Sequence, residues 1–179
     1  MKNILLAVVF LALSVSIVFG QMNKEAQKKA IEAQRAEMKK LDSWVGKWEG
    51  SGWMQQGAER ETFTGTEIVQ RKLDGLAMLV EGKFTNKENV VIHETLAVVS
   101  YNPKTKNYDF STYLASGNKG IYELKATADG WQWEIPFPGG KIRYMTKLTA
   151  DTWFEIGEMS MDDGKTWRKF FEMTLKRVQ

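Results

Sequence analysis

From Val45 to the end of the chain, apolar and polar residues alternate with a period of two, and this pattern constrains the fold more than any other feature. Such alternation is typical of strands with one buried face and one solvated face. It predicts an all-β domain over residues 42–179. The clearest alternating runs are residues 76–84, 122–126, 131–135, 141–148 and 171–177.

Turn-forming residues separate these runs at the spacing of a meander. Asp74-Gly75, Asp129-Gly130 and Asp163-Gly164 are examples, and all three prolines lie in or beside such turns. The sequence therefore predicts roughly ten strands in up-and-down order. A sheet of that width usually curls, and closure removes its exposed edges. We expect a closed antiparallel barrel, with a sandwich as the second choice.

Residues 21–41 precede the strands and predict one helix, whose strong helix formers run from residue 23 to 41. Its apolar stripe is thin and consists mainly of Ile31, Met38, Leu41 and Val45. A stripe of this kind can cover part of a barrel but cannot form a core helix. The apolar stripe contains no aromatic residues, so this Lys-rich segment fits a solvated surface better than a membrane surface.

Residues 1–20 have the features of a secretory signal peptide. Lys2 gives a positive start, Ile4 to Phe19 is almost continuously apolar, and Val18-Phe19-Gly20 offers a cleavage site before Gln21. An uncleaved anchor is less favoured, since a span needs about 20 apolar residues. The expectation is export to the periplasm or the medium, with no stable membrane span after cleavage.

Composition excludes several classes of function. The chain has no Cys, which excludes a thiol nucleophile, a His/Cys zinc site and a lipid attached to an N-terminal Cys. Its 25 Lys and Arg residues face 22 Asp and Glu residues, and they are spread along the chain rather than clustered. Nucleic-acid binding needs a concentrated basic face, so no nucleic-acid partner is expected. No pattern in the sequence indicates an oligomeric state.

The first strand begins with Gly46-Lys47-Trp48, and two further glycines share the face of Trp48. We expect Trp48 to point into the barrel and close one end, with the glycines letting the strand bend around it. Arg177 is inward by alternation on the last strand. It is predicted to lie across the Trp48 indole in a cation–π contact.

Gly46-x-Trp48 together with the terminal Arg177 resembles the lipocalin/calycin signature. More narrowly, residues 38–178 are similar to an uncharacterised bacterial lipocalin-like family related to nitrobindins. This resemblance implies a ligand-binding barrel. Haem binding of the nitrobindin kind relies on a histidine in the late strands, and residues 141–179 contain none. We therefore expect no haem and assign no other cofactor.

Ser160 to Trp167 reads S-M-D-D-G-K-T-W and resembles the Asp-box of sialidases. Sialidases repeat this motif across propeller blades, whereas it occurs once here in a much shorter chain. It is interpreted as a turn device. Asp162 would accept backbone N–H bonds, Gly164 would supply positive φ, and Trp167 would pack beneath the turn.

Residues for conventional catalysis are few. His93 is the single histidine, and an exposed or hydrogen-bonded strand histidine is favoured over a haem ligand or general base. Alternation places Glu155 and Glu158 on opposite faces of their strand. A hydrolase or isomerase would depend on His93 or Glu158 alone, so no catalytic or metal-ligating residue is assigned.

A ligand site is predicted inside the barrel, because ten strands enclose more space than side chains readily fill. The expected ligand is a small apolar or amphipathic molecule, oriented by two threonines at a mouth opposite Trp48. The rival hypotheses are the enzyme above and a structural envelope protein with a filled barrel. The predicted lining residues are Phe110, Thr112, Trp131, Trp133, Tyr144 and Thr146.

Overall fold

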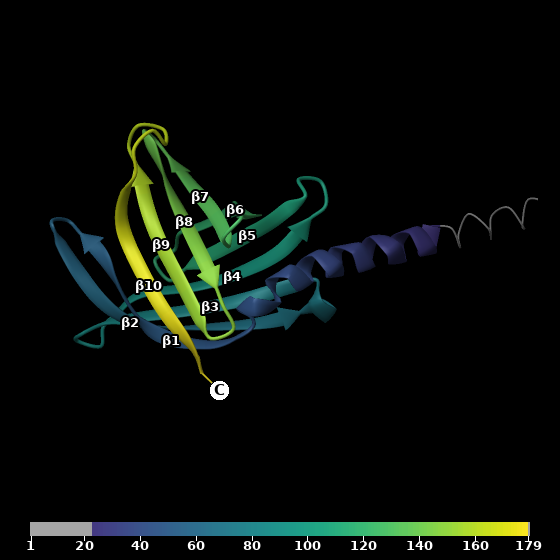
Figure 1. Cartoon of the computed structure of the whole chain (residues 1–179), viewed down its shortest axis with the longest axis horizontal. Coiled ribbons are helices and arrows are strands. Elements are labelled where there is room, and N and C mark those ends of the chain that lie inside the picture. The colour runs from purple at the N-terminus through teal and green to yellow at the C-terminus, as the bar shows by residue number, and fades with distance from the viewer. Residues whose placement is uncertain (1–22, 179) are drawn as a thin grey trace, which may run out of the picture.

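The computed structural model describes residues 23–178, which form a closed antiparallel barrel of ten strands preceded by a helix (Figure 1). The predicted all-β up-and-down barrel is confirmed, and the sandwich alternative is not observed. Each strand pairs with its neighbours in sequence, and β1 and β10 pair with each other to close the sheet. Closure gives every strand two neighbours, which limits the unpaired edge available for pairing with other chains.

The ten strands fall in the alternating part of the sequence. In chain order they are β1 (Gly46–Gln56), β2 (Glu59–Lys72), β3 (Ala77–Asn86), β4 (Val91–Asn102), β5 (Asn107–Leu114), β6 (Lys119–Ala126), β7 (Trp131–Phe137), β8 (Gly140–Leu148), β9 (Thr152–Ser160) and β10 (Arg168–Val178). A short 3-10 turn, η2 (Leu73–Gly75), connects β2 to β3.

Closure brings the two ends of the barrel sequence together. Trp48 on β1 lies directly opposite Arg177 on β10 and, on its other side, opposite Glu67 on β2. The inward faces of the strands carry mostly the apolar members of the alternating pattern, and these side chains form the core. The first and last strands therefore support one another, although they are far apart in sequence.

One seam of the barrel is weakly paired. β6 and β7 share only the register pairs Lys125↔Gln132 and Ala126↔Trp131, next to the turn that joins them. The rest of the two strands diverge, while β6 remains paired with β5 and β7 with β8. Inter-strand hydrogen bonds thus hold this seam at one end only.

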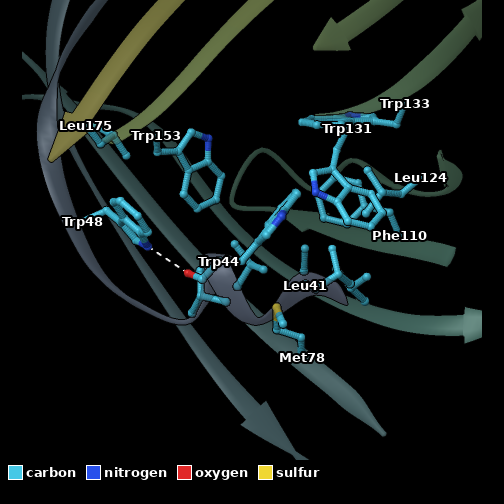
Figure 2. Close-up of a cluster of buried hydrophobic side chains, with 14 of the residues drawn as sticks. Leu41, Trp44, Trp48, Met78, Phe110, Leu124, Trp131, Trp133, Trp153 and Leu175 are labelled. Carbon is cyan, nitrogen blue, oxygen red and sulfur yellow. Dashed lines mark hydrogen bonds between the residues drawn. The ribbon is translucent and has the colours of Figure 1, made fainter. Parts of the chain in front are cut away.

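The segment before β1 closes one end of the barrel (Figure 2). A helix over residues 23–38 continues as a 3-10 helix, η1 (Lys39–Trp44), which buries Leu41 and Trp44 against the ends of the strands. Trp44 packs on Trp153 at 5.0 Å between ring centroids and on Trp131 at 6.2 Å. Leu41 and Trp44 are three residues apart, so the 3-10 helix places both on its buried face, while Asp42 and Ser43 between them are exposed. This segment therefore enters the barrel as a plug.

The helix itself is held only near its C-terminal end. Residues 23–30 are exposed, whereas Met38 is buried and the Tyr108 hydroxyl donates to the Glu37 carbonyl. Figure 1 shows the helix leading away from the barrel. The helix does not cover the mouth opposite Trp48, because η1, which continues it, docks at the Trp48 end.

The predicted signal peptide, residues 1–20, lies outside the described residues. Within residues 23–178, none of the helices is both long enough and apolar enough to cross a membrane.

Candidate ligand-binding site

A cavity of about 210 Å³ lies inside the barrel. Its walls are mostly aromatic and aliphatic side chains, all ten strands contribute to the lining, and Trp44 and Trp153 border it at the closed end. Ligand sites in proteins commonly combine an apolar wall with a few polar groups that orient the ligand. This cavity has that composition, so it is the candidate site.

Trp48 and Arg177 seal the floor beneath the cavity. Trp48 is fully buried, and its Nε1 donates to the Trp44 carbonyl at 2.8 Å (Figure 2). Arg177 Cζ lies 4.0 Å from the Trp48 ring centroid, as a cation–π contact requires. The same guanidinium donates to the carbonyls of Ser43, Val45 and Ala150, so it ties the segment around η1 to the turn between β8 and β9.

Gly46 is required beside this contact. Its φ of +142° is unfavourable for residues with a side chain, and a Cβ at this position would collide with Arg177 Nη1. Glycine therefore lets the chain turn from η1 into β1 while the guanidinium lies against its backbone.

Four of the six predicted lining residues border the cavity. The four residues are Phe110 and Thr112 on β5, Trp133 on β7 and Tyr144 on β8. The Trp133 and Tyr144 rings are stacked, with centroids 5.1 Å apart and planes 18° from parallel. They present a flat aromatic wall to whatever occupies the cavity.

The other two predicted lining residues lie elsewhere. Trp131 packs edge-on against Trp44 and Tyr108 at the closed end, rather than near the mouth opposite Trp48. Thr146 is 1% exposed and donates its hydroxyl to Glu155 Oε2 at 3.1 Å. Thr146 thus contacts the cavity through a carboxylate and not directly.

His93 and Glu158 lie in different environments. His93 borders the cavity beside Phe84, and burial lowers the pKa of its imidazole. This corrects the favoured interpretation of an exposed or hydrogen-bonded histidine. Glu158 does not border the cavity: its Oε2 accepts from Nε and Nη2 of Arg143, whose guanidinium stacks on Trp167. Among residues 23–178, no three His, Cys, Asp or Glu side chains are grouped as a metal site would require.

Two buried carboxyl groups in the cavity wall were not among the predicted residues. Glu155 on β9 is buried, and its Oε2 accepts from Thr146 Oγ1 and from Trp153 Nε1, both at 3.1 Å. Burial raises the pKa of Glu155 to about 7, although the two hydrogen bonds act in the opposite direction. The cavity therefore contains a carboxyl group that titrates near neutral pH.

Glu67 on β2 is the second buried carboxyl group. Its Oε2 is inaccessible to solvent and has no hydrogen-bond partner among the described residues. Burial, with the nearby Glu155 as a smaller cause, raises the pKa of Glu67 well above its usual range. Gly82 lies opposite on β3, where a Cβ would come within 2.6 Å of Glu67 Oε1. Trp44 also borders this cavity, and its indole Nε1 is likewise buried without a partner among residues 23–178.

A signal for Glu67 exists in the sequence. The inward-facing positions of β2 are taken by Phe63, Gly65, Glu67 and Val69. Glu67 is therefore a charged residue at a position where the alternating pattern predicts a buried side chain. A buried charge without a partner is costly, and strands normally place such residues on the solvated face. A charged residue in the inward phase therefore marks a candidate site.

The Ser160–Trp167 segment forms a tight turn between β9 and β10. Asp162 Oδ1 accepts from the Thr166 backbone N–H at 2.8 Å, and Gly164 has a φ of +88°. The Trp167 indole donates to the Gly164 carbonyl at 3.0 Å. Hydrogen bonds from Thr166 and Ser160 lower the pKa of Asp162 to about 2. These are the contacts of a structural turn, and none of these residues borders the cavity.

Comparisons with known proteins support the fold alone. No protein-family model matches the sequence, and no curated protein matches it. Solved structures similar to this chain include Rv2717c from M. tuberculosis, at 11% identity and a TM-score of 0.60, covering 79% of this chain and 97% of that one. Another is the S-type phycobiliprotein lyase CPES from Guillardia theta, at 12% identity and a TM-score of 0.56. That similarity covers 79% of this chain and 92% of the lyase chain. At these identities, both similarities show the barrel fold and nothing beyond it.

Proposed function

We propose that this protein binds a small, largely apolar molecule in the barrel cavity. The observation that supports the proposal is the cavity of about 210 Å³, which is lined mainly by aromatic and aliphatic side chains with a few polar groups among them. Apolar surface leaving water would supply most of the affinity, at about 25 cal/mol per Å² before the cost of ordering the ligand. The stacked Trp133 and Tyr144 rings provide a face for an aromatic ligand.

This cavity favours binding over the two rival functions. A barrel that served only as a structural element would gain stability from a filled interior, because each void removes packing contacts. The enzyme hypothesis loses Glu158, which pairs with Arg143 away from the cavity. Of the two residues on which that hypothesis depends, only His93 borders the cavity.

The test compares ligand binding before and after the cavity is filled. Native mass spectrometry of the purified protein would reveal a retained molecule, and intrinsic tryptophan fluorescence would report binding of small aromatic compounds. Ala97 borders the cavity and is buried, so Ala97→Phe should abolish binding. Leu96, its neighbour, is 40% exposed, and Leu96→Phe is the matched control.

Binding that survives in a folded Ala97→Phe protein would place the ligand elsewhere. If no compound binds more tightly than about 100 µM, which corresponds to about −5.5 kcal/mol, and native mass spectrometry finds no ligand, the proposed function is wrong. Circular dichroism of each variant verifies that the barrel has formed.

We also propose that the barrel functions outside the cytoplasm. The support is the sequence of residues 1–20, with its positive start, its apolar run and Val18-Phe19-Gly20. Intact mass of the protein recovered from cell fractions tests this. A chain beginning at Gln21 in the periplasm or medium would agree with the proposal, and a full-length chain in the cytoplasm would contradict it.

A further inference from the structure

A fatty acid or another anion would need basic groups in the cavity, whereas the charged groups in this cavity are acidic. Glu67 and Glu155 are both buried and both border the cavity, and they are close enough for Glu155 to raise the pKa of Glu67. No Lys or Arg side chain is among the lining residues. Within the described part of the chain, the cavity therefore has acidic groups but no basic residue other than His93, whose pKa is lowered.

Glu67 has hydrogen-bonding capacity that the protein leaves unused. Its Oε2 is buried and lacks a partner among residues 23–178, whereas Glu155 Oε2 already accepts two hydrogen bonds. A buried acceptor without a partner costs about 1–3 kcal/mol, and more when it is charged. Gly82 leaves space for the Glu67 carboxyl, so this arrangement is accommodated by the neighbouring strand. A ligand that donates hydrogen bonds to Glu67 would remove this cost.

The surrounding aromatic rings suit a positive charge as well. Trp133 and Tyr144 stack on one side of the cavity, and Trp44 and Trp153 border its floor. Indole and phenol faces attract cations within about 6 Å of the ring centroid, most strongly where water is excluded. Acidic groups and aromatic faces in one cavity favour an ammonium group, which interacts with both.

The size of the cavity limits the rest of the ligand. Its 210 Å³ exceeds the roughly 150 Å³ of an engineered apolar cavity that holds benzene. One aromatic ring fits, together with a short chain of a few heavy atoms. The apolar walls require that most of the molecule beyond its charged end be hydrocarbon.

We propose that the cavity binds a small organic amine in its protonated form, an aromatic ring with a short aminoalkyl chain, whose ammonium group donates to Glu67 and Glu155. This inference rests on the proposed function and specifies its ligand class. The ring lies against the aromatic wall formed by Trp133 and Tyr144. Trp44 borders the same cavity, and its Nε1 is the second unpartnered polar atom, which would donate to an acceptor such as a hydroxyl group on the ligand.

The charge of the occupied site depends on pH. Five lining side chains can titrate: Glu67, His93, Tyr122, Tyr144 and Glu155. Binding an ammonium ion favours ionised carboxyl groups, so it should release protons where these groups are still protonated. A protonated His93 at low pH would repel the ligand. Both effects make the affinity rise as the pH increases from about 5 to 8.

The experiment uses three compounds of similar shape, titrated into the purified protein by calorimetry at pH 7.5. They are 2-phenylethylamine, the neutral 2-phenylethanol and the anionic 3-phenylpropanoate. A hydrogen bond to a charged group contributes about 1.5–3 kcal/mol, so the amine should bind at least about 10-fold more tightly than the alcohol. The carboxylate should bind most weakly of the three.

Variants then test the two carboxyl groups. Glu67→Gln and Glu155→Gln keep the side-chain shape but remove the charge, and each should weaken amine binding by about 10-fold or more. The affinity for the alcohol should change far less. Glu81→Gln is the matched control, because Glu81 is an exposed residue next to Gly82 on β3.

The possible results separate the two proposals. If none of the three compounds binds, and no retained ligand is found, the proposed function itself fails. If the alcohol or the carboxylate binds as tightly as the amine, the cavity binds ligands but the amine proposal is overturned. Equal amine affinity in Glu67→Gln, Glu155→Gln and wild type would also overturn it. Should a variant fail to fold, the ranking of the three compounds on the wild-type protein decides.

Discussion

At the scale of single residues, the closed end depends on one aromatic–cation pair. Trp48 is inaccessible to solvent, and Arg177 lies over its ring while donating to three backbone carbonyls. Gly46 permits this approach because it has no Cβ. Residues near both ends of the barrel sequence therefore form one unit, and their contributions to stability should be coupled.

A double-mutant cycle measures that coupling. Trp48→Ala removes a large buried side chain and should lower the free energy of unfolding by about 3–5 kcal/mol. Arg177→Ala should cost less. Residues in contact show interaction energies of about 0.5–3 kcal/mol, so the two changes together should not equal the sum of the single changes. Chemical denaturation measures all four proteins, and strict additivity would contradict the contact.

Glu155 should make stability depend on pH. Its pKa is raised from 4.5 to about 7 by folding, so between these values the folded protein keeps a proton that the unfolded chain has released. Stability should therefore fall as the pH rises from 4.5 to 7, by up to about 3 kcal/mol at 1.36 kcal/mol per pKa unit. His93, with its lowered pKa, acts in the opposite direction below pH 6.5.

The contribution of Glu155 is isolated by comparing Glu155→Gln with the wild type. Urea denaturation at several pH values from 4.5 to 8 should give the variant a growing advantage as the pH rises. Parallel profiles for the two proteins would show that Glu155 does not titrate in this range.

At the scale of elements, the strands are not equally secured. Most neighbouring strands pair along much of their length, but β6 and β7 pair only beside their turn. Tyr122 on β6 and Ile135 on β7 both border the cavity. Local opening should require least free energy where inter-strand hydrogen bonds are fewest, so this seam is the weakest part of the wall.

Hydrogen exchange followed by NMR should identify the seam. Two sets of amides should exchange faster than other strand amides. They are the amides of residues 119–124 that point towards β7 and the amides of residues 133–137 that point towards β6. The alternate amides of the same strands pair with β5 and β8 and serve as internal controls. Equal protection of both sets would mean that the seam is closed in solution.

At the scale of the whole molecule, the folding unit extends beyond the ten strands. η1 contributes Leu41 and Trp44 to the core. Trp48 donates a hydrogen bond to the Trp44 carbonyl, and Arg177 donates to the carbonyls of Ser43 and Val45. By contrast, the first part of the helix, residues 23–30, is exposed. The barrel therefore needs the plug but not the start of the helix.

Two N-terminal deletions test this division. A chain that starts at residue 35 should keep its melting temperature within about 3 °C, because it loses little buried surface. A chain that starts at residue 46 loses the plug and should be destabilised by several kcal/mol, as expected when large buried side chains are removed at about 3–5 kcal/mol each. Equal melting temperatures for the two deletions would contradict a structural role for η1.

The sequence by itself determined the fold class and the facing of most side chains. Alternation is a local property, since successive residues of a strand point to opposite faces. It therefore placed Phe110, Trp133 and Tyr144 inside, and it separated Glu155 from Glu158. The pairing of Trp48 with Arg177 was also accessible, because a closed meander must join its first and last strands.

Only the tertiary structure decided where along the barrel axis each inward residue lies. Trp131 is inward as expected, but β7 starts at the closed end, so its ring packs on Trp44 instead of lining the cavity. Likewise, alternation says nothing of how a segment before the first strand will dock. Glu67 and Glu155 face one cavity because barrel closure brings β2 and β9 around the same interior. Alternation with a period of two residues gives the face of each side chain but not the distance between two side chains across the barrel.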